Sequence, residues 1–473
     1  MKEQYSIPRC MIAAAGSGSG KTTVTVGLIG ALKKKGFDPV SFKCGPDYID
    51  PMFHRRACGI DAVSLDTFFA GEAGVRRLVA KYASAGEKSE SRYAVIEGVM
   101  GIYDGMKPDS LSGSCYEIAS VTKTPIILTV DASGVGRTVI PLIKGILADD
   151  DKNLIKGIIF NRMSDAFYEK IYPVIKDELA KIRKDVGILG HIPKKSGIDI
   201  SSRHLGLKMP DDVEDITEKI RLITQLICEK CDIDAITGIM TEAGCIEPAE
   251  DESEDNTALP GEEYRADRPV RLAVAKDEAF CFYYTENLNM LMDAGVEPVY
   301  FSPVHDAALP DNVSGLLFGG GYPELYLNEL SSNTSMLASI REAMNAGMPC
   351  IAECGGFMYL HKEVEDVSGA GYELVGAIDG RCTYTGHLVN FGYVEVAECD
   401  KMQCLKGMRG HEFHYYDSTS CGSDALLEKP STGRRYRGMI ADRGKLMGFA
   451  HLYYRSAPEA VFEFVKEMER YGN

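Results

Sequence analysis

The sequence predicts an α/β protein with two domains, each built around a parallel β-sheet. Short apolar runs such as YAVIEG and TPIILTVD alternate with helical stretches in the first half of the chain. The runs RLAVAK and MPCIAEC repeat this pattern in the second half. Near-continuous apolar strands that alternate with helices are typical of parallel sheets covered on both faces. At 473 residues the chain is also too long for one ordinary domain.

An acidic stretch separates the two halves. Residues 246–264 contain no Lys or Arg and are rich in Glu, Asp and Pro. Such a segment cannot bury a core, so it is typical of a solvated linker. We therefore expect a first domain over residues 1–245, a linker over 246–268 and a second domain over 269–473.

The composition limits the classes of partner. A net charge of −17 argues against nucleic acid or an anionic membrane. The 14 cysteines are scattered and the N-terminus carries no secretory signal, which predicts reduced thiols and a cytoplasmic protein. Cys228 and Cys231 form a C-x-x-C without a second pair at metal spacing, so we expect a structural or surface role rather than zinc. The sequence allows a homodimer but does not fix the oligomeric state.

The stretch GSGSGKTT lies between an apolar run at residues 10–14 and an amphipathic run at 24–35. A dinucleotide-binding loop would need a further Gly where Lys21 stands, so the pattern favours a P-loop, although Ala15 replaces its first Gly. In a P-loop the backbone N–H groups surround phosphate, the Lys reaches the β- and γ-phosphates and the first Thr hydroxyl holds Mg²⁺. The candidate ATP-binding residues are Gly18, Gly20, Lys21, Thr22 and Thr23.

Carboxylates that follow neighbouring strands could complete a Mg²⁺ site. Glu97 comes directly after an apolar run, and Asp47 and Asp50 lie in the loop GPDYIDP. We expect Thr22, Asp47 and Glu97 to serve the metal, while a plain turn role is the alternative for each Asp. Three further candidates follow other strands: Asp104, Asp131 and, for reading the adenine edge, Asn161.

The second half contains a candidate nucleophile. In CIAECGGF, Cys354 stands between an apolar run and two glycines that open a helix, which is the pattern of a nucleophile elbow. A helix N-terminus is expected to lower the pKa of the thiol. The N–H groups of Gly355 and, in FGGGYPE, of Gly320 could form an oxyanion hole. The expected base is His451 in GFAHLYY, with His411 and His414 in GHEFHYY as rivals.

An ATP site and a Cys/His amide hydrolase on one chain suggest that glutamine hydrolysis supplies ammonia to a carboxylate activated by ATP. The chain resembles the cobyrinate a,c-diamide synthase family of glutamine-hydrolysing carbon–nitrogen ligases over nearly its whole length. The motifs that carry the resemblance are GSGSGKTTVTVGL, GPDYIDPMFH, SSRHLGL, DEAFCFYY, GGGYPELY, AECGGFMYL and GHEFHYY, in that order.

The resemblance implies a dethiobiotin-synthetase-like P-loop domain followed by a class I glutamine amidotransferase domain. It implies amidation of the a- and c-carboxylates of cobyrinate in cobalamin biosynthesis, through an acyl phosphate, with ATP, Mg²⁺ and L-glutamine. Cys354 would be the nucleophile and His451 its base. Many class I enzymes carry a Glu two residues after this His, where this chain has Tyr453, so the site resembles a dyad and leaves the third member of a triad unassigned.

The acceptor that the resemblance implies is a polycarboxylate, so a local cationic cluster must overcome the negative net charge. The resemblance assigns the acceptor side to the loop that contains Tyr48 and Asp50, with Asp50 next to the reacting carboxylate. The candidate cations are Lys43, Arg55 and Arg56 around that loop, and Arg203 and His204 in SSRHLGL.

Two alternatives remain open from the sequence. The chain could be a sibling amidotransferase that acts on hydrogenobyrinate or on nickel-sirohydrochlorin. From a different class, it could be a P-loop switch ATPase with an inert amidotransferase-like domain, although the intact Cys354 and His451 argue against inertness.

Overall fold

The computed structural model describes residues 5–59, 61–84, 92–195, 197–198, 202–203, 206–207, 213, 215–247 and 265–472. The chain divides into two compact units, Met1–Asp255 and Asn256–Asn473. Most of the predicted linker over 246–268 lies outside the described residues, as does His204. In the described part of the chain, no helix is both long and apolar enough to cross a membrane.

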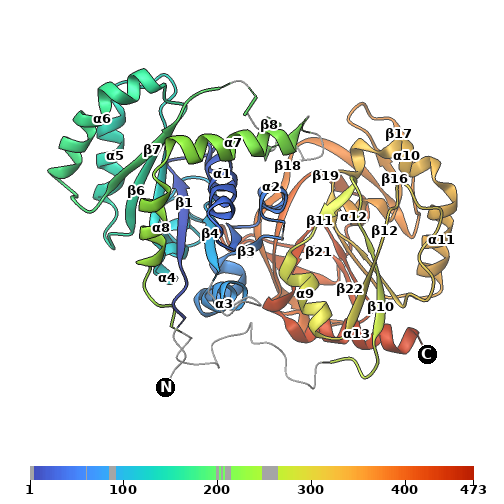
Figure 1. Ribbon diagram of the computed structural model, residues 1–473. Helices are drawn as coiled ribbons and strands as arrows, with labels where there is room; N and C mark the ends of the chain where they lie inside the picture. Colours follow the sequence, from blue (N-terminus) through green and yellow to red (C-terminus); the bar gives the residue numbers. More distant parts are fainter. Residues whose placement is uncertain are drawn as a thin grey trace. The chain divides into compact units, whose positions relative to one another are not determined.

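A seven-stranded parallel sheet forms the centre of the first unit (Figure 1), in the order β3-β2-β4-β1-β5-β6-β7. Its central strands are buried along most of their length, which explains why they read as near-continuous apolar runs. The strands are β1 (Arg9–Ala14), β2 (Pro39–Cys44), β3 (Val63–Leu65), β4 (Tyr93–Glu97), β5 (Ile126–Asp131), β6 (Ile155–Asn161) and β7 (Gly187–Ile192). A two-stranded hairpin of β8 (Ser202–Arg203) and β9 (Gly206–Leu207) follows.

The first helix packs closely along a later one (Figure 1). Gly27 and Gly30 of α1 face α7, and a Cβ at Gly27 would lie 2.5 Å from Ile227 Cγ1, so only glycine permits this approach. The close contact fixes α1, whose N-terminus carries the P-loop. The helices of this unit are α1 (Lys21–Lys34), α2 (Ile49–Cys58), α3 (Thr67–Ala83), α4 (Cys115–Val121), α5 (Val139–Ala148), α6 (Asp165–Ala180), α7 (Ile216–Lys230) and α8 (Ile233–Thr241).

The second unit contains a six-stranded sheet in the order β12-β10-β13-β15-β23-β22, parallel except for the edge strand β22. Its strands are β10 (Val270–Ala275), β12 (Val296–Phe301), β13 (Gly315–Phe318), β15 (Cys350–Glu353), β22 (Ile440–Asp442) and β23 (Lys445–Gly448). Two short strands, β11 (Phe280–Phe282) and β14 (Gly320–Gly321), form a separate antiparallel sheet. The helices are α9 (Thr285–Asp293), α10 (Leu327–Ser332), α11 (Thr334–Asn345), α12 (Gly355–Tyr359) and α13 (Pro458–Tyr471), with 3₁₀ turns η4 (Pro323–Leu325), η5 (Gln403–Leu405) and η6 (Tyr454–Ser456).

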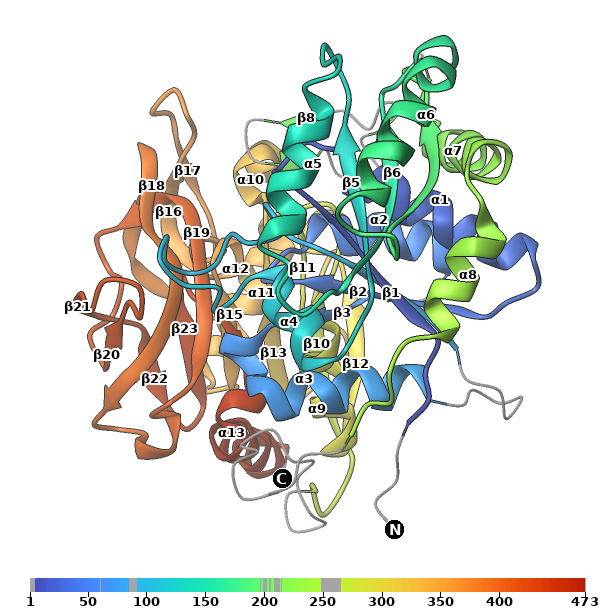
Figure 2. The same cartoon turned by 90° about the vertical axis from the view of Figure 1, so that its left-hand side faces the viewer.

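A second, mostly antiparallel sheet was not predicted from the sequence. Its two long strands, β18 and β19, run side by side in Figure 2, and β24 pairs with β19. Buried and more exposed residues alternate along β19, as expected for a strand with one face on the core, so no continuous apolar run marks it. The strands are β16 (His361–Glu365), β17 (Gly371–Glu373), β18 (Ile378–Cys399), β19 (Arg409–Ser418), β20 (Ala425–Glu428), β21 (Arg435–Gly438) and β24 (His451–Tyr453).

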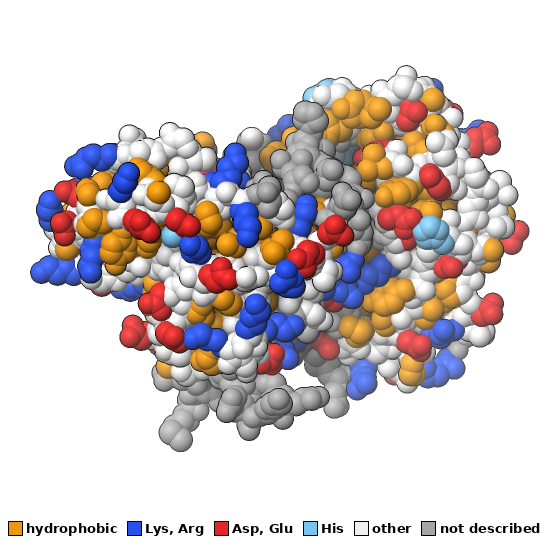
Figure 3. Space-filling model, turned by 45° about the horizontal axis from the view of Figure 1, so that its top comes forward, with side chains coloured by type: hydrophobic (Ala, Val, Ile, Leu, Met, Phe, Trp, Pro, Cys, Tyr) orange, Lys and Arg blue, Asp and Glu red, His pale blue; other side chains and the backbone are white. Residues whose placement is uncertain are grey.

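Acidic and basic side chains intermingle over the face that Figure 3 shows. Although the chain has a net charge of −17, the described residues of this face show no large area of a single charge. Any cluster that attracts an anion must be local.

Candidate active sites

The P-loop consists of the six residues between the end of β1 at Ala14 and the start of α1 at Lys21. Gly18 and Gly20 have φ angles of 73° and 92°, a left-handed conformation that glycine adopts without strain. A Cβ at Gly20 would collide with the side-chain amide of Asn161, whereas Gly16 and Gly18 have open space within 4 Å of that position. The loop is thus closed on the Asn161 side and open at Gly16 and Gly18, which fits a loop that must admit a phosphate.

The side chains of Lys21 and Asn161 donate hydrogen bonds to carbonyl groups of the loop. Lys21 Nζ donates to the carbonyls of Gly16, at 3.1 Å, and Met100, at 2.6 Å. Burial lowers the pKa of Lys21, and repulsion from Lys43 adds to this effect. Asn161 Nδ2 donates to the carbonyl of Ser19 at 2.9 Å, so its amide supports the loop. Its adenine-reading role stays a prediction.

Glu97, the carboxylate predicted to bind the metal, is the last residue of β4. Thr22 Oγ1 donates to Glu97 Oε1 at 2.7 Å, and Glu97 Oε2 is 2.5 Å from His54 Nε2. Both Glu97 and His54 are fully buried. The hydroxyl and the carboxylate that we expected to serve Mg²⁺ are therefore adjacent, and His54 fixes the second oxygen.

Asp47 and Asp50 surround a buried lysine. Lys43 Nζ is 3.0 Å from Asp50 Oδ2 and 3.8 Å from Asp47 Oδ2, and it donates to the carbonyl of Gly98 at 2.9 Å. Burial alone would lower the pKa of Lys43, but Asp50, Glu97 and Asp47 raise its pKa above the usual value. Burial would likewise raise the pKa of Asp50, yet Lys43 holds it at about 2.

Asp47 also fills the turn role that was its alternative. Its Oδ1 accepts from the N–H groups of Ile49, at 2.9 Å, and Asp50, at 3.1 Å, and so begins α2. Burial raises the pKa of Asp47 to about 6, and repulsion from Asp50 contributes. The same carboxylate thus shapes the loop and faces Lys43.

Of the residues expected in the cationic cluster, the structure describes the side chains of Lys43, Arg55 and Arg56, and the first two have acidic partners. Lys43 is only 1% exposed and pairs with Asp50, so it is a buried counter-charge here, and its contact with the acceptor stays a prediction. Arg55 pairs with Asp61 at 3.0 Å on the surface. Arg203 lies in β8, with its side chain outside the described part of the structure. Tyr48 directly precedes α2, next to Asp47.

Two other candidate carboxylates are used in turns. Asp104 Oδ2 accepts from the N–H of Gly101 at 2.8 Å. Asp131 Oδ1 accepts from the N–H of Ser133 at 2.9 Å, and its Oδ2 pairs with Arg162 at 2.7 Å. These contacts match the turn alternative.

No three His, Cys, Asp or Glu side chains group as a metal cage in the part of the chain that the structure describes. The pair Cys228 and Cys231 accordingly has one exposed and one buried free thiol. Mg²⁺ does not need such a cage, because it is usually bound through one or two carboxylates together with phosphate oxygens and water. The Thr22 hydroxyl and the Glu97 carboxylate fit that pattern.

Cys354 occupies a strained elbow between β15 and α12. Its φ and ψ are 49° and −108°, which is rare for a non-glycine residue and characteristic of functional turns. The chain can turn here because its neighbours are small. A Cβ at Gly355 would lie 2.7 Å from Pro323 Cδ, and one at Gly356 would collide with the backbone of Phe318. Cys354 N donates to the carbonyl of Gly448 at 2.8 Å, which ties the elbow to β23.

The expected low pKa of the thiol is wrong. Burial raises the pKa of Cys354 above its usual range, and the negative charge of Glu324 raises it further. The N–H of Gly355 points at the sulfur and lowers the pKa, but its effect is smaller. A five-residue helix in a buried setting therefore does not produce a resting thiolate.

His451 begins β24 and lies against the glycine loop. A Cβ at Gly320 would lie 3.0 Å from His451 Nε2, so the ring packs directly on that backbone. The same glycine loop approaches the elbow, because a Cβ at Gly355 would be 3.3 Å from the N of Gly321. The elbow, the predicted oxyanion loop and His451 therefore converge. Burial lowers the pKa of His451 to about 3, and the proximity of His414 adds to this.

The rival histidines are differently placed. His414 Nδ1 donates to the carbonyl of Tyr416 at 2.6 Å, and its ring stacks on Phe449. His411 lies opposite His451 in the β19–β24 pairing, and burial lowers its pKa to about 3, with His451 contributing. Only His451 packs on the glycine loop among these three, within the described contacts.

The similarities to known proteins agree with both sites. The CobQ/CobB/MinD/ParA nucleotide binding domain matches residues 10–207, and the CobB/CobQ-like glutamine amidotransferase domain matches residues 271–457. A protein named cobyrinate a,c-diamide synthase from Caldanaerobacter subterraneus subsp. tengcongensis is 35% identical, over 98% of this chain and 98% of its own. Proteins of the same name from Clostridium tetani and Listeria innocua are 38% and 34% identical over 85% and 96% of this chain, and over 86% and 98% of their own.

The chain belongs to the cobyrinate a,c-diamide synthase family. It is a glutamine-hydrolysing ligase with an N-terminal nucleotide-binding domain and a C-terminal amidotransferase domain. The predictions of fold class and family are confirmed.

Several buried polar residues of the amidotransferase domain were not among the candidates predicted from the sequence. Glu353, directly before Cys354, has Oε2 3.8 Å from His451 Nδ1. Glu412 and Lys429 form an ion pair at 2.6 Å, and each is 3% exposed. A Glu next to the nucleophile in AECGG, and a Glu between two histidines in GHEFH, were the available signals.

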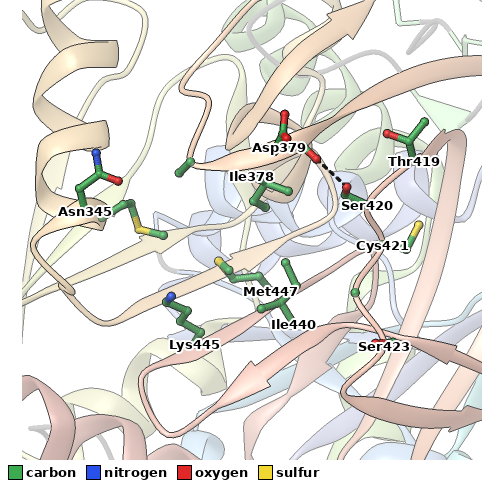
Figure 4. A pocket seen from close by; sticks show the side chains of 13 residues that line it. Asn345, Ile378, Asp379, Thr419, Ser420, Cys421, Ser423, Ile440, Lys445 and Met447 are labelled. Atoms are coloured by element: carbon green, nitrogen blue, oxygen red, sulfur yellow. Dashed lines mark hydrogen bonds between the residues drawn. The ribbon is translucent and has the colours of Figure 1, made fainter.

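A separate pocket of about 710 Å³ lies elsewhere in the amidotransferase domain (Figure 4). Its lining includes Asp379, Ser420, Lys445 and Met447, and Ser420 Oγ donates to the carbonyl of Asp379 at 2.7 Å. Cys354 and His451 are not part of that lining. The pocket is therefore distinct from the nucleophile site.

Proposed function

We propose that this enzyme amidates the a- and c-carboxylates of cobyrinate in cobalamin biosynthesis, with nitrogen from L-glutamine and with ATP and Mg²⁺. One observation carries the proposal. The P-loop and the cysteine elbow occur together on a chain that a cobyrinate a,c-diamide synthase matches over 98% of its length. We further propose that it works in the cytoplasm.

In the glutaminase half-reaction, Cys354 attacks the amide carbon of glutamine. Because the thiol and the imidazole both rest uncharged, the thiol proton moves to His451 as the S–C bond forms. The N–H groups of Gly355 and Gly320 stabilise the oxyanion. His451 then gives its proton to the leaving nitrogen, which departs as ammonia, and water releases glutamate from the thioester.

In the synthetase half-reaction, MgATP supplies the phosphoryl group that activates the acceptor carboxylate. Lys21 and the backbone at Gly18 and Gly20 would bind the phosphates, and Thr22, Glu97 and Asp47 would hold the metal. Asp50, held ionised by Lys43, would act next to the acceptor carboxylate, as the family resemblance implies. Because Lys43 is buried, Arg55 and Arg203, with Tyr48, are the proposed contacts for the acceptor itself.

The acceptor is tested by competition between tetrapyrroles. The purified enzyme is given ATP, Mg²⁺ and glutamine with cobyrinate, hydrogenobyrinate or nickel-sirohydrochlorin, and amide products are measured by mass spectrometry. We expect kcat/KM to be highest for cobyrinate, with two amides formed. A preference for either other tetrapyrrole would assign the enzyme to a sibling reaction, and ATP hydrolysis without any amidation would favour a switch ATPase.

A further inference from the structure

Glu353 is a buried carboxylate that touches the segment carrying the base. It is the last residue of β15 and is 5% exposed. Its Oε1 accepts from the N–H of Leu452 at 3.3 Å, and its Oε2 lies 3.8 Å from His451 Nδ1. The hydroxyl of Tyr454 also donates to it. The side chain thus contacts three residues of one short segment, His451 to Tyr454.

A carboxylate is unfavourable in this position unless it has a partner. The other residues of β15, Cys350, Ile351 and Ala352, are buried and apolar, and an apolar side chain could also fill the place of Glu353. Burial raises the pKa of Glu353 to about 8, which the hydrogen bonds from Leu452 and Tyr454 only partly offset. Buried groups with such shifts are concentrated at functional sites.

The geometry also supplies what the sequence motif lacks. Tyr453 stands two residues after His451, so the chain has no acid at that spacing from the histidine. A histidine that acts through Nε2 is usually oriented by an acceptor at Nδ1. The ring of His451 meets the Gly320 backbone at Cε1, and Glu353 Oε2 lies 3.8 Å from Nδ1, so the carboxylate is on the side of the ring where such an acceptor is needed.

We propose that Glu353 is the positioning residue of the glutaminase site and acts through His451. This inference rests on the proposed glutaminase chemistry and extends it. Glu353 accepts from Nδ1–H, so that Nε2 is free to take the thiol proton of Cys354. An ionised Glu353 balances the positive charge of the buried imidazolium, which would otherwise be strongly destabilised, and that positive charge in turn opposes the effect of burial on the pKa of Glu353. The separation of 3.8 Å is longer than a hydrogen bond, and catalytic contacts of this kind commonly shorten when substrate binds.

The test removes the negative charge of Glu353 and keeps the shape of its side chain. Glu353→Gln is compared with Glu353→Asp and with the control Glu365→Gln, which removes a carboxylate that pairs with Arg381 away from the nucleophile. Glutamate release is measured without ATP or a tetrapyrrole, and ammonia-dependent amidation is measured separately. A wild-type enzyme that releases glutamate but amidates no cobyrinate would contradict the proposed acceptor and leave this test intact.

We expect Glu353→Gln to lower kcat for glutamate release by about 10²-fold or more, with little change in KM, because only the charged state of His451 loses its partner. The pH optimum of glutamate release should move upward, because thiolate must then come from solvent deprotonation of Cys354. The titratable groups facing this carboxylate are His451, Cys354, Tyr283 and Tyr454. Glu353→Asp should be intermediate, and the ammonia-dependent rate should stay unchanged in both variants.

Two results would overturn the proposal. The first is a folded Glu353→Gln variant whose kcat is within about twofold of wild type. The second is equal loss in folded Glu353→Gln and Glu353→Asp without any shift in pH optimum, which indicates packing alone. If thermal unfolding shows that Glu353→Gln does not fold, Glu353→Asp decides: a lowered kcat with unchanged KM supports the role, and a wild-type kcat excludes it.

Discussion

Cys354 and His451 illustrate how burial sets the charge of single residues. Burial raises the pKa of the thiol and lowers the pKa of the imidazole to about 3, so both groups are neutral near pH 7 in the resting site. The pair differs from cysteine sites that hold a thiolate permanently. Its reactivity therefore depends on proton transfer at the moment of attack, and on the backbone donors beside the strained elbow.

This resting state can be measured by alkylation. We expect iodoacetamide to modify Cys354 slowly near pH 7 and progressively faster above about pH 9, because only the thiolate reacts. Peptide mass spectrometry gives the rate at each pH, with Cys228, an exposed free thiol on α7, as the reference in the same digest. A rate for Cys354 that is already at its plateau near neutral pH would contradict the neutral pair.

At the scale of elements, the sites that the sequence predicted are those built from one continuous segment. The P-loop and the elbow each place a small-residue turn between a strand and a helix, so their residues are neighbours in the chain. The antiparallel sheet, the burial of Lys43 and the contact of Glu353 with His451 depend on segments far apart in sequence. The pattern of apolar residues within one segment cannot predict which distant segment it pairs with. In addition, β19 lacks a continuous apolar run.

The P-loop geometry makes a prediction for its last glycine. Gly20→Ala should weaken nucleotide binding and lower ammonia-dependent synthesis by about tenfold or more, because the new Cβ collides with Asn161 and the left-handed φ is strained. Gly36→Ala is the matched control, since it has a φ of 86° with open space around it. It should lose about 1–2 kcal/mol of stability and keep its nucleotide affinity. Equal nucleotide affinities in the two variants would refute the role of the closed loop.

For the whole molecule, the central claim is a division of labour between two compact units. Nucleotide chemistry belongs to the unit Met1–Asp255, and glutamine hydrolysis belongs to the unit Asn256–Asn473. Loss of the nucleophile should remove one source of nitrogen and leave the synthetase chemistry intact. Loss of Lys21 should stop product formation with either nitrogen source, because no neutral side chain replaces its charge at the phosphates.

Isotope transfer tests this claim most directly. Wild-type enzyme and Cys354→Ala are each given cobyrinate, ATP and Mg²⁺, either with glutamine labelled at its amide nitrogen or with ammonium. We predict that wild type places the label in both new amides of the corrinoid, and that Cys354→Ala places none yet still forms both amides from ammonium. Label transfer by Cys354→Ala, or glutamine hydrolysis by wild type with no label in the corrinoid, would contradict the account.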